Sequence, residues 1–339
     1  MHHIQGTTLI SGIFKKILNL HTHISMPAFT ILRLSFLLSL ALFITPIFSN
    51  ASAAEQKIMI VHQASRDFSQ QLIHQLEKEL SSSGYQTESM MLNEQQFDTG
   101  RLKTQQLLIA IGSKTTRTLL EHKLEQPILS LLIPMQIADS FKMRYPEQKN
   151  WASLVIDQPV DRQFHLITQI LGKQKQVGVL LGPNTMSFEQ KLSTAARKTG
   201  HKITLEPIEN SDQLSTSLKA LKNKTDVLLT LADPVIYNKN TIRGILLLSY
   251  RNRLPIIGFS SAYVKAGAIA AVYSEPVQIS EQAARITGNY FQSSAFTQTI
   301  FYPDEFSISV NNKVARSLGI RLPENTSIIK QIKKAERTQ

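Results

Sequence analysis

The 339-residue sequence contains no cysteine. This absence excludes disulfides, thiolate metal sites and a cysteine nucleophile. It also excludes the acylated N-terminal cysteine of a bacterial lipoprotein, so only polypeptide segments could attach the protein to a membrane. Hydrophobic residues make up 42% of the chain, which is enough apolar material for two modest cores. We therefore expect two lobes.

The sequence also lacks an apolar run of the roughly 20 residues that a membrane-spanning helix requires. Its nearest approach is 34–44 (LSFLLSLALFI), and the small-x-small pattern Ala51-Ser52-Ala53 follows. A short apolar core before such a pattern is typical of a secretory signal peptide, so we predict that residues 1–53 are removed on export. An uncleaved N-terminal anchor is the alternative. Met26 would begin a conventional signal peptide, which makes residues 1–25 a candidate over-extension of the start.

Export without a lipidation site predicts a soluble periplasmic protein of a bacterium with two membranes. The first 54 residues hold three basic residues and no acidic one, so their removal changes the formal net charge from +12 to +9. The basic excess is spread thinly, with small groups at Lys219, Lys222 and Lys224 and at Lys330, Lys333 and Lys334. Without interleaved aromatic residues or a nucleic-acid-binding module, we interpret these groups as solvated faces and expect no nucleic-acid partner. A weak attraction to anionic surfaces is the alternative.

The chain has no glycine-rich dinucleotide or phosphate-binding motif, and the histidines after the predicted signal lack metal-ligand spacing. We therefore expect neither a metal nor a cofactor. Residues 258–262 (GFSSA) resemble the nucleophile elbow of a hydrolase, because a serine follows a predicted strand. Such hydrolases need a histidine later in the chain, whereas the last histidine here is His201. We predict that the protein is not an enzyme.

Patterns typical of a strand, a polar turn and a helix alternate through the rest of the chain. Buried strands are predicted at 57–61, 87–92, 107–111, 126–133, 152–157, 176–181, 202–207, 226–231 and 256–259. The same order in both halves predicts an α/β fold with two Rossmann-like lobes and parallel sheets. Residues 135–151 are polar, show no clear period and are predicted to be irregular.

Two predicted crossing points between the lobes, at Gln158-Pro159 and at residues 274–276, set the domain boundaries. Lobe 1 is assigned residues 55–157 and 274–300, lobe 2 is assigned residues 158–273 and 301–325, and residues 326–339 are a charged tail. A helix predicted at 277–291 is returned to lobe 1.

The stretch 225–273 carries most of the chemical information. Polar and aromatic side chains follow its two predicted strands, namely Asp233, Tyr237, Ser260, Ser261 and Tyr263. Ligands of open parallel sheets bind outside the carboxyl ends of the strands, so these side chains are predicted to share one ligand-binding edge. The tyrosines are equally compatible with stacking on a ligand and with a place in the core.

A comparable turn follows the predicted strand 107–111. Gly112 permits close backbone approach, and Ser113, Thr115 and Thr116 stand where hydroxyls can cap a helix. The N-terminus of a helix also binds carboxylates through its free N–H groups and its dipole. A plain N-cap and a carboxylate site are the two alternatives.

Several segments together resemble the tryptophan/tyrosine-type ABC-transporter substrate-binding proteins, which have the type I periplasmic binding fold. In the second half they are 253–261 (RLPIIGFSS), 264–270 (VKAGAIA), 282–284 (QAA), 310–320 (VNNKVARSLGI) and Leu322-Pro323. The resemblance extends over 176–323. In the first lobe it rests on 110–116 (AIGSKTT) and 126–129 (QPIL).

The resemblance implies a small ligand, often an amino acid, held between two closing lobes. The positions that match the family's ligand-binding turns are Ser113 and Thr115 in lobe 1 and Asn184 and Thr185 in lobe 2. By the same resemblance, Asp233 would face a ligand ammonium group. The family usually carries an Asp-Pro followed by a Gly-Leu pair and then a Gly-x-Asn-x-Thr-Gly segment, and residues 134–155 have neither.

Two hypotheses follow. The first is a solute-binding protein that delivers a small metabolite, such as an amino acid or a related amine or carboxylate, to an ABC permease. It predicts a polar cleft and closure of the lobes on the ligand. The alternative is a sensory or interaction module of the same fold, with a degenerate cleft, that binds a membrane receptor. We expect a monomer in either case.

Overall fold

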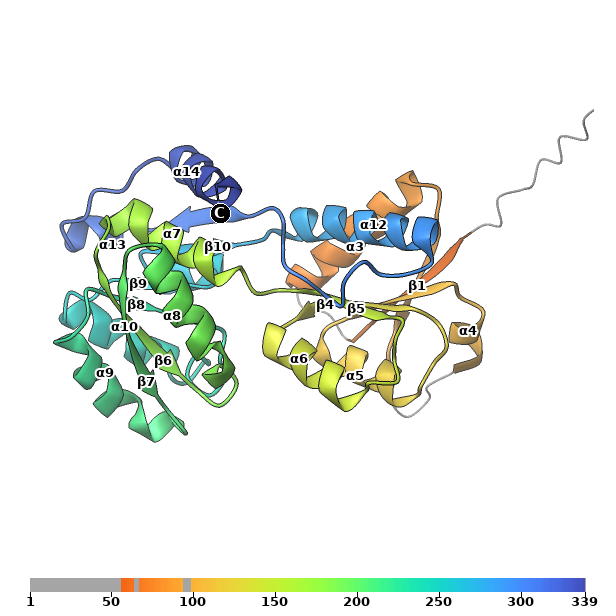
Figure 1. Ribbon diagram of the computed structural model, residues 1–339, viewed down its shortest axis with the longest axis horizontal. Helices are drawn as coiled ribbons and strands as arrows, with labels where there is room; N and C mark the ends of the chain where they lie inside the picture. Colours follow the sequence, from red (N-terminus) through yellow and green to blue (C-terminus); the bar gives the residue numbers. More distant parts are fainter. Residues whose placement is uncertain (1–55, 64–66, 94–98, 339) are drawn as a thin grey trace, which may run out of the picture. The chain divides into compact units, whose positions relative to one another are not determined.

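The computed structural model describes residues 56–63, 67–93 and 99–338. The predicted signal peptide of residues 1–53, with its anchor alternative, lies outside these ranges. The described residues belong to one compact unit, Glu55–Gln339. They form two six-stranded sheets with alternating strands and helices, which confirms the predicted fold class (Figure 1).

The first sheet has the strand order β11-β5-β4-β3-β1-β2, and all its neighbouring strands are parallel. Its strands are β1 (Lys57–His62), β2 (Gln86–Met91), β3 (Leu107–Ile111), β4 (Ile128–Ile133), β5 (Trp151–Val155) and β11 (Ile300–Phe301). Helices α3 (Asp67–Ser82) and α12 (Pro276–Ser293) cover one face. The other face is covered by α4 (Thr99–Lys103), α5 (Ser113–Glu121) and α6 (Met135–Arg144) (Figure 1).

Burial on both faces explains why the central strands of this sheet are continuous apolar runs. All five residues of β3 are buried. In β1, Ile58 and Ile60 pack under α3 and α12, whereas Met59 and Val61 belong to the core on the opposite face. Successive side chains of a strand alternate between faces, so a sheet covered on both sides needs apolar residues at every position.

The second sheet has the order β12-β10-β9-β8-β6-β7. Its strands are β6 (Gln176–Leu181), β7 (Lys202–Pro207), β8 (Val227–Leu229), β9 (Ile256–Gly258), β10 (Ala270–Tyr273) and β12 (Ser307–Val310). Among these described strands, only β12 runs antiparallel to its neighbour, β10. The predicted parallel arrangement therefore holds except at this edge, where antiparallel strands are common in otherwise parallel sheets.

Two groups of helices cover the second sheet. One face packs against α7 (Val160–Leu171), α8 (Glu189–Lys198) and α14 (Asn325–Arg337), with α13 (Asn312–Ser317) beside them. The other face packs against α9 (Leu214–Lys222), α10 (Ile242–Arg251) and α11 (Ser261–Ala266). Two short 3-10 helices, η1 (Met186–Phe188) and η2 (Ser211–Gln213), precede α8 and α9. Among the helices of the described ranges, none has the length and apolar character needed to cross a bilayer.

Helix α6 corrects the sequence prediction, which left residues 135–151 irregular. Met135, Ala138 and Phe141 are buried at helical spacing, so the segment has an apolar stripe that its polar residues hid. The N-cap residue Pro134 makes no capping side-chain hydrogen bond. Instead Asp157, on a distant part of the chain, accepts a 2.6 Å hydrogen bond from the Met135 amide. The helix is thus completed by a tertiary contact.

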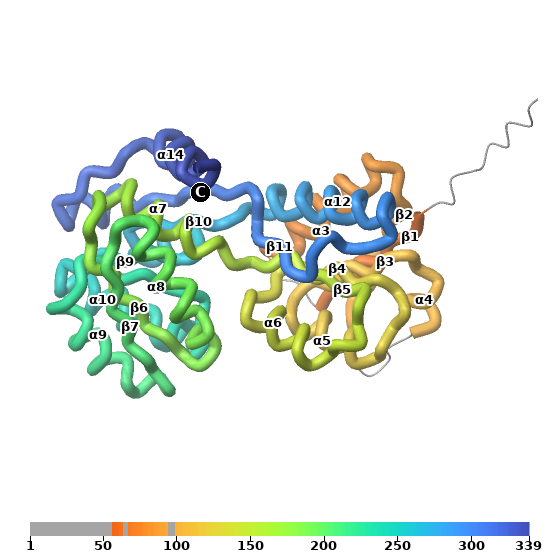
Figure 2. Tube along the Cα trace, in the orientation of Figure 1, coloured from red at the N-terminus to blue at the C-terminus, as the bar shows by residue number. Residues whose placement is uncertain are grey.

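Three segments pass between the two sheets, as the trace in Figure 2 shows. They are residues 156–159 after β5, 274–275 after β10 and 302–306 after β11. We call them the crossings. The C-terminal segment, expected only as a charged tail, forms α14, and its buried Ile328 and Ile332 pack into the core of the second sheet.

Candidate functional site

The turns after β6 and β8 meet at the carboxylate of Asp233. This residue is 1% exposed. Its Oδ2 accepts hydrogen bonds from the Asn184 amide at 3.0 Å and the Thr185 hydroxyl at 3.1 Å. Its Oδ1 accepts from Asn184 Nδ2 at 3.3 Å and from the Val235 amide at 3.0 Å. Since β6 and β8 are parallel neighbours, their carboxyl ends bring these three predicted site residues together.

Gly182 allows the carboxylate to lie directly against the main chain. A Cβ at this position would overlap the carboxyl group of Asp233. The Gly182 amide also donates a 3.0 Å hydrogen bond to the Thr185 hydroxyl oxygen. All of these partners are protein groups, so Asp233 organises the turn without any ligand. The contact of Asp233 with a ligand ammonium group stays a prediction.

An aromatic cluster lies beside this turn. The ring centroids of Tyr237 and Tyr263 are 5.8 Å apart, and Phe259 lies 6.0 Å from the first and 4.7 Å from the second. Burial raises the pKa of both tyrosine hydroxyls, and Tyr263 and Asp233 add a smaller effect at Tyr237. The hydroxyls are therefore neutral donors. Within the described residues, neither of them has a hydrogen-bond partner.

The two serines after β9 have structural partners. Ser260 is the N-cap of α11, and its side-chain oxygen accepts from the Tyr263 amide at 3.3 Å. Ser261 hydrogen-bonds to Tyr273. Burial and the neighbouring Glu275 raise the pKa of Tyr273 to about 12, and the hydrogen bond with Ser261 opposes this shift. These serines shape the edge of the sheet as well as lining it.

In the first sheet, the turn after β3 is built differently. Gly112 is the N-cap of α5 with a φ of 88°, a conformation that favours glycine, and no side chain caps the helix. The plain N-cap alternative for the hydroxyls is therefore wrong. Thr116 donates back to the Gly112 carbonyl at 3.0 Å, and Ser113 is half-buried. Thr115 is 0% exposed, and its Oγ1 has no hydrogen-bond partner in the described part of the chain.

Sequence reasoning missed Gln136, which joins the two sheets. It lies in the first turn of α6, and its Nε2 donates to the Ala232 carbonyl, next to Asp233, at 3.5 Å. Its Oε1 is buried without a partner among the described residues. Just before this helix, Leu132 has a φ of 58° at a β-bulge of β4. Bulges and left-handed non-glycine residues are concentrated at functional sites.

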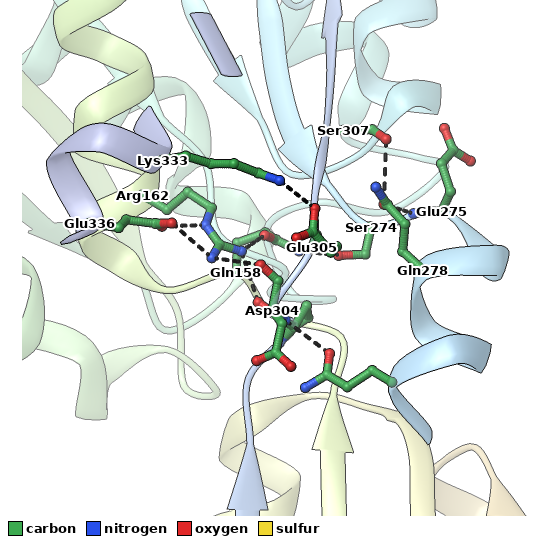
Figure 3. Close-up of polar contacts among 12 residues, drawn as sticks. Gln158, Arg162, Ser274, Glu275, Gln278, Asp304, Glu305, Ser307, Lys333 and Glu336 are labelled. Carbon is green, nitrogen blue, oxygen red and sulfur yellow. Dashed lines mark hydrogen bonds and ion pairs between the residues drawn. The ribbon is translucent and has the colours of Figure 1, made fainter. Parts of the chain in front are cut away.

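The crossings are tied together by a polar network around Arg162, drawn in Figure 3. The buried guanidinium donates to Glu336 Oε1 at 2.5 Å, to Gln158 Oε1 at 2.8 Å and to the Pro303 carbonyl at 2.9 Å. Gln158 in turn donates to the Ser274 hydroxyl at 2.9 Å. These bonds join all three crossings. Figure 3 shows that α14 contributes Glu336 to the network.

The same region holds a half-buried acid. Burial raises the pKa of Asp157, and the hydrogen bond from the Met135 amide opposes that effect. Because Asp157 stands in the first crossing and caps α6, the helix that carries Gln136 is fixed directly to a crossing. No group of metal-binding side chains occurs among the described residues.

Two α/β sheets joined by three crossings, with polar turns at the carboxyl ends of their strands, define a two-lobed binding protein. The profile of the family described as "ABC transporter substrate binding protein" matches residues 50–334. This match covers most of the sequence, so the chain belongs to that family. No curated protein sequence matches the chain.

Several solved structures are similar in fold. A Streptococcus pneumoniae ABC domain in complex with L-Trp is 16% identical, with a TM-score of 0.58 over 82% of this chain and 98% of that chain. A conserved domain protein of Vibrio cholerae is 21% identical, with the same TM-score and coverage. The ligand-free, open form of CD0873 of Clostridium difficile, a substrate-binding protein with adhesive properties, is 18% identical. Its TM-score is 0.62 over 80% of this chain and 97% of that chain.

Proposed function

We propose that the protein is a periplasmic solute-binding protein that captures a small metabolite at the carboxyl ends of β3, β6, β8 and β9 and delivers it to an ABC permease. Membership of the substrate-binding family supports the class of function. The nine predicted site residues are the proposed ligand-binding set, and the protein acts by binding rather than by catalysis.

The observation that carries this proposal is a group of buried polar atoms without partners. Three of the predicted site residues, Thr115, Tyr237 and Tyr263, each have such an atom in the described part of the chain. Burying a polar atom without a hydrogen bond costs about 1–3 kcal/mol, and native proteins retain few of them. A ligand whose polar groups supply the missing partners explains why these hydroxyls are kept.

The chemistry of the turns favours an amino acid or a related amine or carboxylate. The first turn of α5 lacks a capping side chain, and a helix N-terminus of this kind attracts a carboxylate. Neutral tyrosine hydroxyls donate hydrogen bonds, and the rings of Tyr237, Phe259 and Tyr263 provide apolar contact. Asp233 supplies a negative charge for an ammonium group, which would take the place of one of its protein donors.

Thermal-shift screening against amino acids, other carboxylates, amines and sugars tests the proposal. A ligand at 100 times its dissociation constant adds about 2.7 kcal/mol to the free energy of unfolding. Titration calorimetry of each hit with wild type and Thr115→Val then locates the site, because the variant replaces only the hydroxyl with a methyl group of similar size. We expect weaker binding by the variant. An unchanged affinity would place the ligand elsewhere, and a panel without hits would contradict capture of these metabolites.

The alternative, a sensory or interaction module that binds a membrane receptor, has one specific observation in its favour. Residues 134–155 lack the family's usual pattern, and Gln136 from this segment contacts the turn of Asp233 with its own side chain. A protein side chain in that place competes with a ligand. If Gln136→Ala gains binding of a metabolite that wild type ignores, the cleft of the wild-type protein is degenerate and the alternative holds.

A further inference from the structure

The helices α9 and α10 and the turns around them carry an unusual balance of charge. Between the acidic residues Asp212 and Glu275, residues 213–274 contain eight basic and only two acidic residues. The two acids, Asp226 and Asp233, already accept backbone hydrogen bonds, from the Gln176 amide and from the Asn184 and Val235 amides respectively. The basic residues are Lys219, Lys222, Lys224, Lys239, Arg243, Arg251, Arg253 and Lys265.

These eight cations are also accessible at the surface. Every one of them is exposed, and none forms an ion pair within the described residues. Elsewhere on the surface, cations such as Lys198, Arg285 and Lys333 are paired with a nearby carboxylate. Within the described residues, no carboxylate is in ion-pair contact with these eight cations, so their charges are available to a partner.

Exposed apolar side chains lie among these charges on α10. Leu247 is 46% exposed and Tyr250 is 59% exposed, and both share one helix face with Arg243 and Arg251 at spacings of three, four and eight residues. The opposite face of α10 is anchored in the core through Ile245. Because the inner face of α10 is already packed in the core, its outer face can contact a partner while the helix stays folded.

Helices α9 and α10 cover the same face of the second sheet, and Figures 1 and 2 place them side by side. The exposed Lys219 and Lys222 of α9 thus extend the surface that α10 presents. We call the exposed side chains of this surface the basic face: Lys219, Lys222, Arg243, Leu247, Tyr250 and Arg251.

We propose that the basic face docks on the surface of an anionic phospholipid bilayer. The cations are spread over two helices instead of surrounding a hollow, which suits an extended anionic surface better than a single anion. Lysine and arginine keep their charged ends at the headgroups while their stems contact apolar material, and tyrosine and leucine settle at the boundary of the acyl chains. An acidic protein surface is the competing occupant.

Binding to vesicles tests the proposal, using residues 54–339, which are the predicted mature protein and include the compact unit Glu55–Gln339. We expect co-sedimentation with vesicles of phosphatidylglycerol and phosphatidylcholine, and little with phosphatidylcholine alone. Raising the salt from about 0.1 M to about 1 M shortens the Debye length from about 10 Å to about 3 Å and should release the protein.

Two charge-reversal variants with the same change in net charge locate the surface. Lys222→Glu, Arg243→Glu and Arg251→Glu together change the basic face. Lys78→Glu, Lys103→Glu and Lys142→Glu change three exposed lysines of the first sheet's helices. Each basic side chain near an anionic bilayer contributes about fivefold to partitioning, so the first variant should lose more than tenfold in affinity. The second should stay within about threefold of wild type, since its lysines lie off the docking face.

Three outcomes would overturn the proposal. The first is that the wild type does not bind anionic vesicles. The second is that both triple variants lose the same affinity, which would assign binding to net charge alone. The third is binding to poly-L-glutamate that depends on the basic face, without binding to vesicles, which would assign the face to an acidic protein. Leu247→Ser with Tyr250→Ser keeps every charge and should still weaken vesicle binding several-fold. Urea unfolding of each variant separates these results from misfolding.

Discussion

The turns at the carboxyl ends of the two sheets differ in how their buried polar side chains are hydrogen-bonded. In the second sheet, Asp233 receives four hydrogen bonds from the turns after β6 and β8. In the first sheet, the turn after β3 leaves Thr115 Oγ1 buried and without a partner among the described residues. The first arrangement is satisfied by protein groups, whereas the second leaves one hydroxyl unsatisfied within the described residues.

This difference distinguishes a carboxylate that is hydrogen-bonded within its own turns from a buried hydroxyl that has no partner among the described residues. A buried carboxylate draws attention in a sequence, yet here its hydrogen-bonding capacity serves its own turn. A threonine is easily overlooked, but a hydroxyl left unpartnered in the interior carries an energetic cost that an additional function can explain.

The largest effect is expected for Asp233→Ala. It leaves the buried donors of Asn184 and Thr185 without an acceptor and should lower the free energy of unfolding by about 3 kcal/mol. Urea denaturation measures the change. Asp226→Ala is the matched control, because Asp226 accepts a backbone hydrogen bond at an exposed position and should cost less than about 1 kcal/mol. Equal losses would mean that the Asp233 turn is not specially organised.

Gly182→Ala should cost about 2 kcal/mol, because the new methyl group overlaps the Asp233 carboxylate and displaces the turn. Gly244→Ala is the control, since Gly244 lies in α10 with open space around its Cα and should gain up to about 1 kcal/mol in helix propensity. Chemical denaturation of both variants decides the matter. A tolerated alanine at position 182 would show that the carboxylate can move away freely.

Thr115→Val should have the opposite sign. Removing a buried hydroxyl that has no partner among the described residues should stabilise the ligand-free protein by up to about 1 kcal/mol, whereas Thr116→Val should cost about 1 kcal/mol. Both residues are 0% exposed, but Thr116 donates to the Gly112 carbonyl. Unfolding curves of the two variants give a direct test, and destabilisation by Thr115→Val would show that its hydroxyl has a partner in the folded protein.

The smallest effect is the pH dependence of stability caused by His201, a second buried group near the second sheet whose hydrogen-bond partners are protein groups. His201 Nδ1 accepts from the Lys175 amide at 3.1 Å, so Nε2 carries the proton and donates to the Thr168 hydroxyl at 2.8 Å. Burial lowers the pKa of His201 below its usual 6.5. The unfolded chain therefore binds a proton first as the pH falls.

The stability that neutral His201 contributes is full above pH 6.5 and is lost as the pH falls through that value toward the folded-state pKa. We expect the free energy of unfolding to fall as the pH is lowered from about 7 to about 5. His201→Gln should flatten this part of the stability profile, and the exposed His74→Gln should leave it unchanged. A profile with the same slope in all three proteins would remove His201 as the cause.

Much of the fold could be predicted because its strands are buried on both faces. Continuous apolar runs such as 107–111 and 176–181 match the bounds of β3 and β6. Helix α6 could not be predicted in this way, because its start depends on Asp157, which lies 22 residues after Met135 in the sequence. The antiparallel direction of β12 is likewise a property of how the last crossing enters the sheet.

The candidate site was predictable as a set of turns but not as a set of contacts. The positions of Asp233, Ser260 and Ser113 in the segments that follow the strands could be predicted from the pattern and from the rule for parallel sheets. Which of these groups bond to one another does not follow from it. The contact of Gln136 with Ala232 joins residues 96 positions apart and left no signal in the local sequence.

By itself the sequence determined the alternation of strands and helices, the two sheets and the polar character of the turns, because periodicity and composition act over short distances. The tertiary structure alone decided that Asp233 is satisfied by its neighbours, and that Thr115 and the exposed cations of α9 and α10 have no partner among the described residues. The physical reason is that hydrogen bonds, burial and unneutralised charge depend on which groups meet in space.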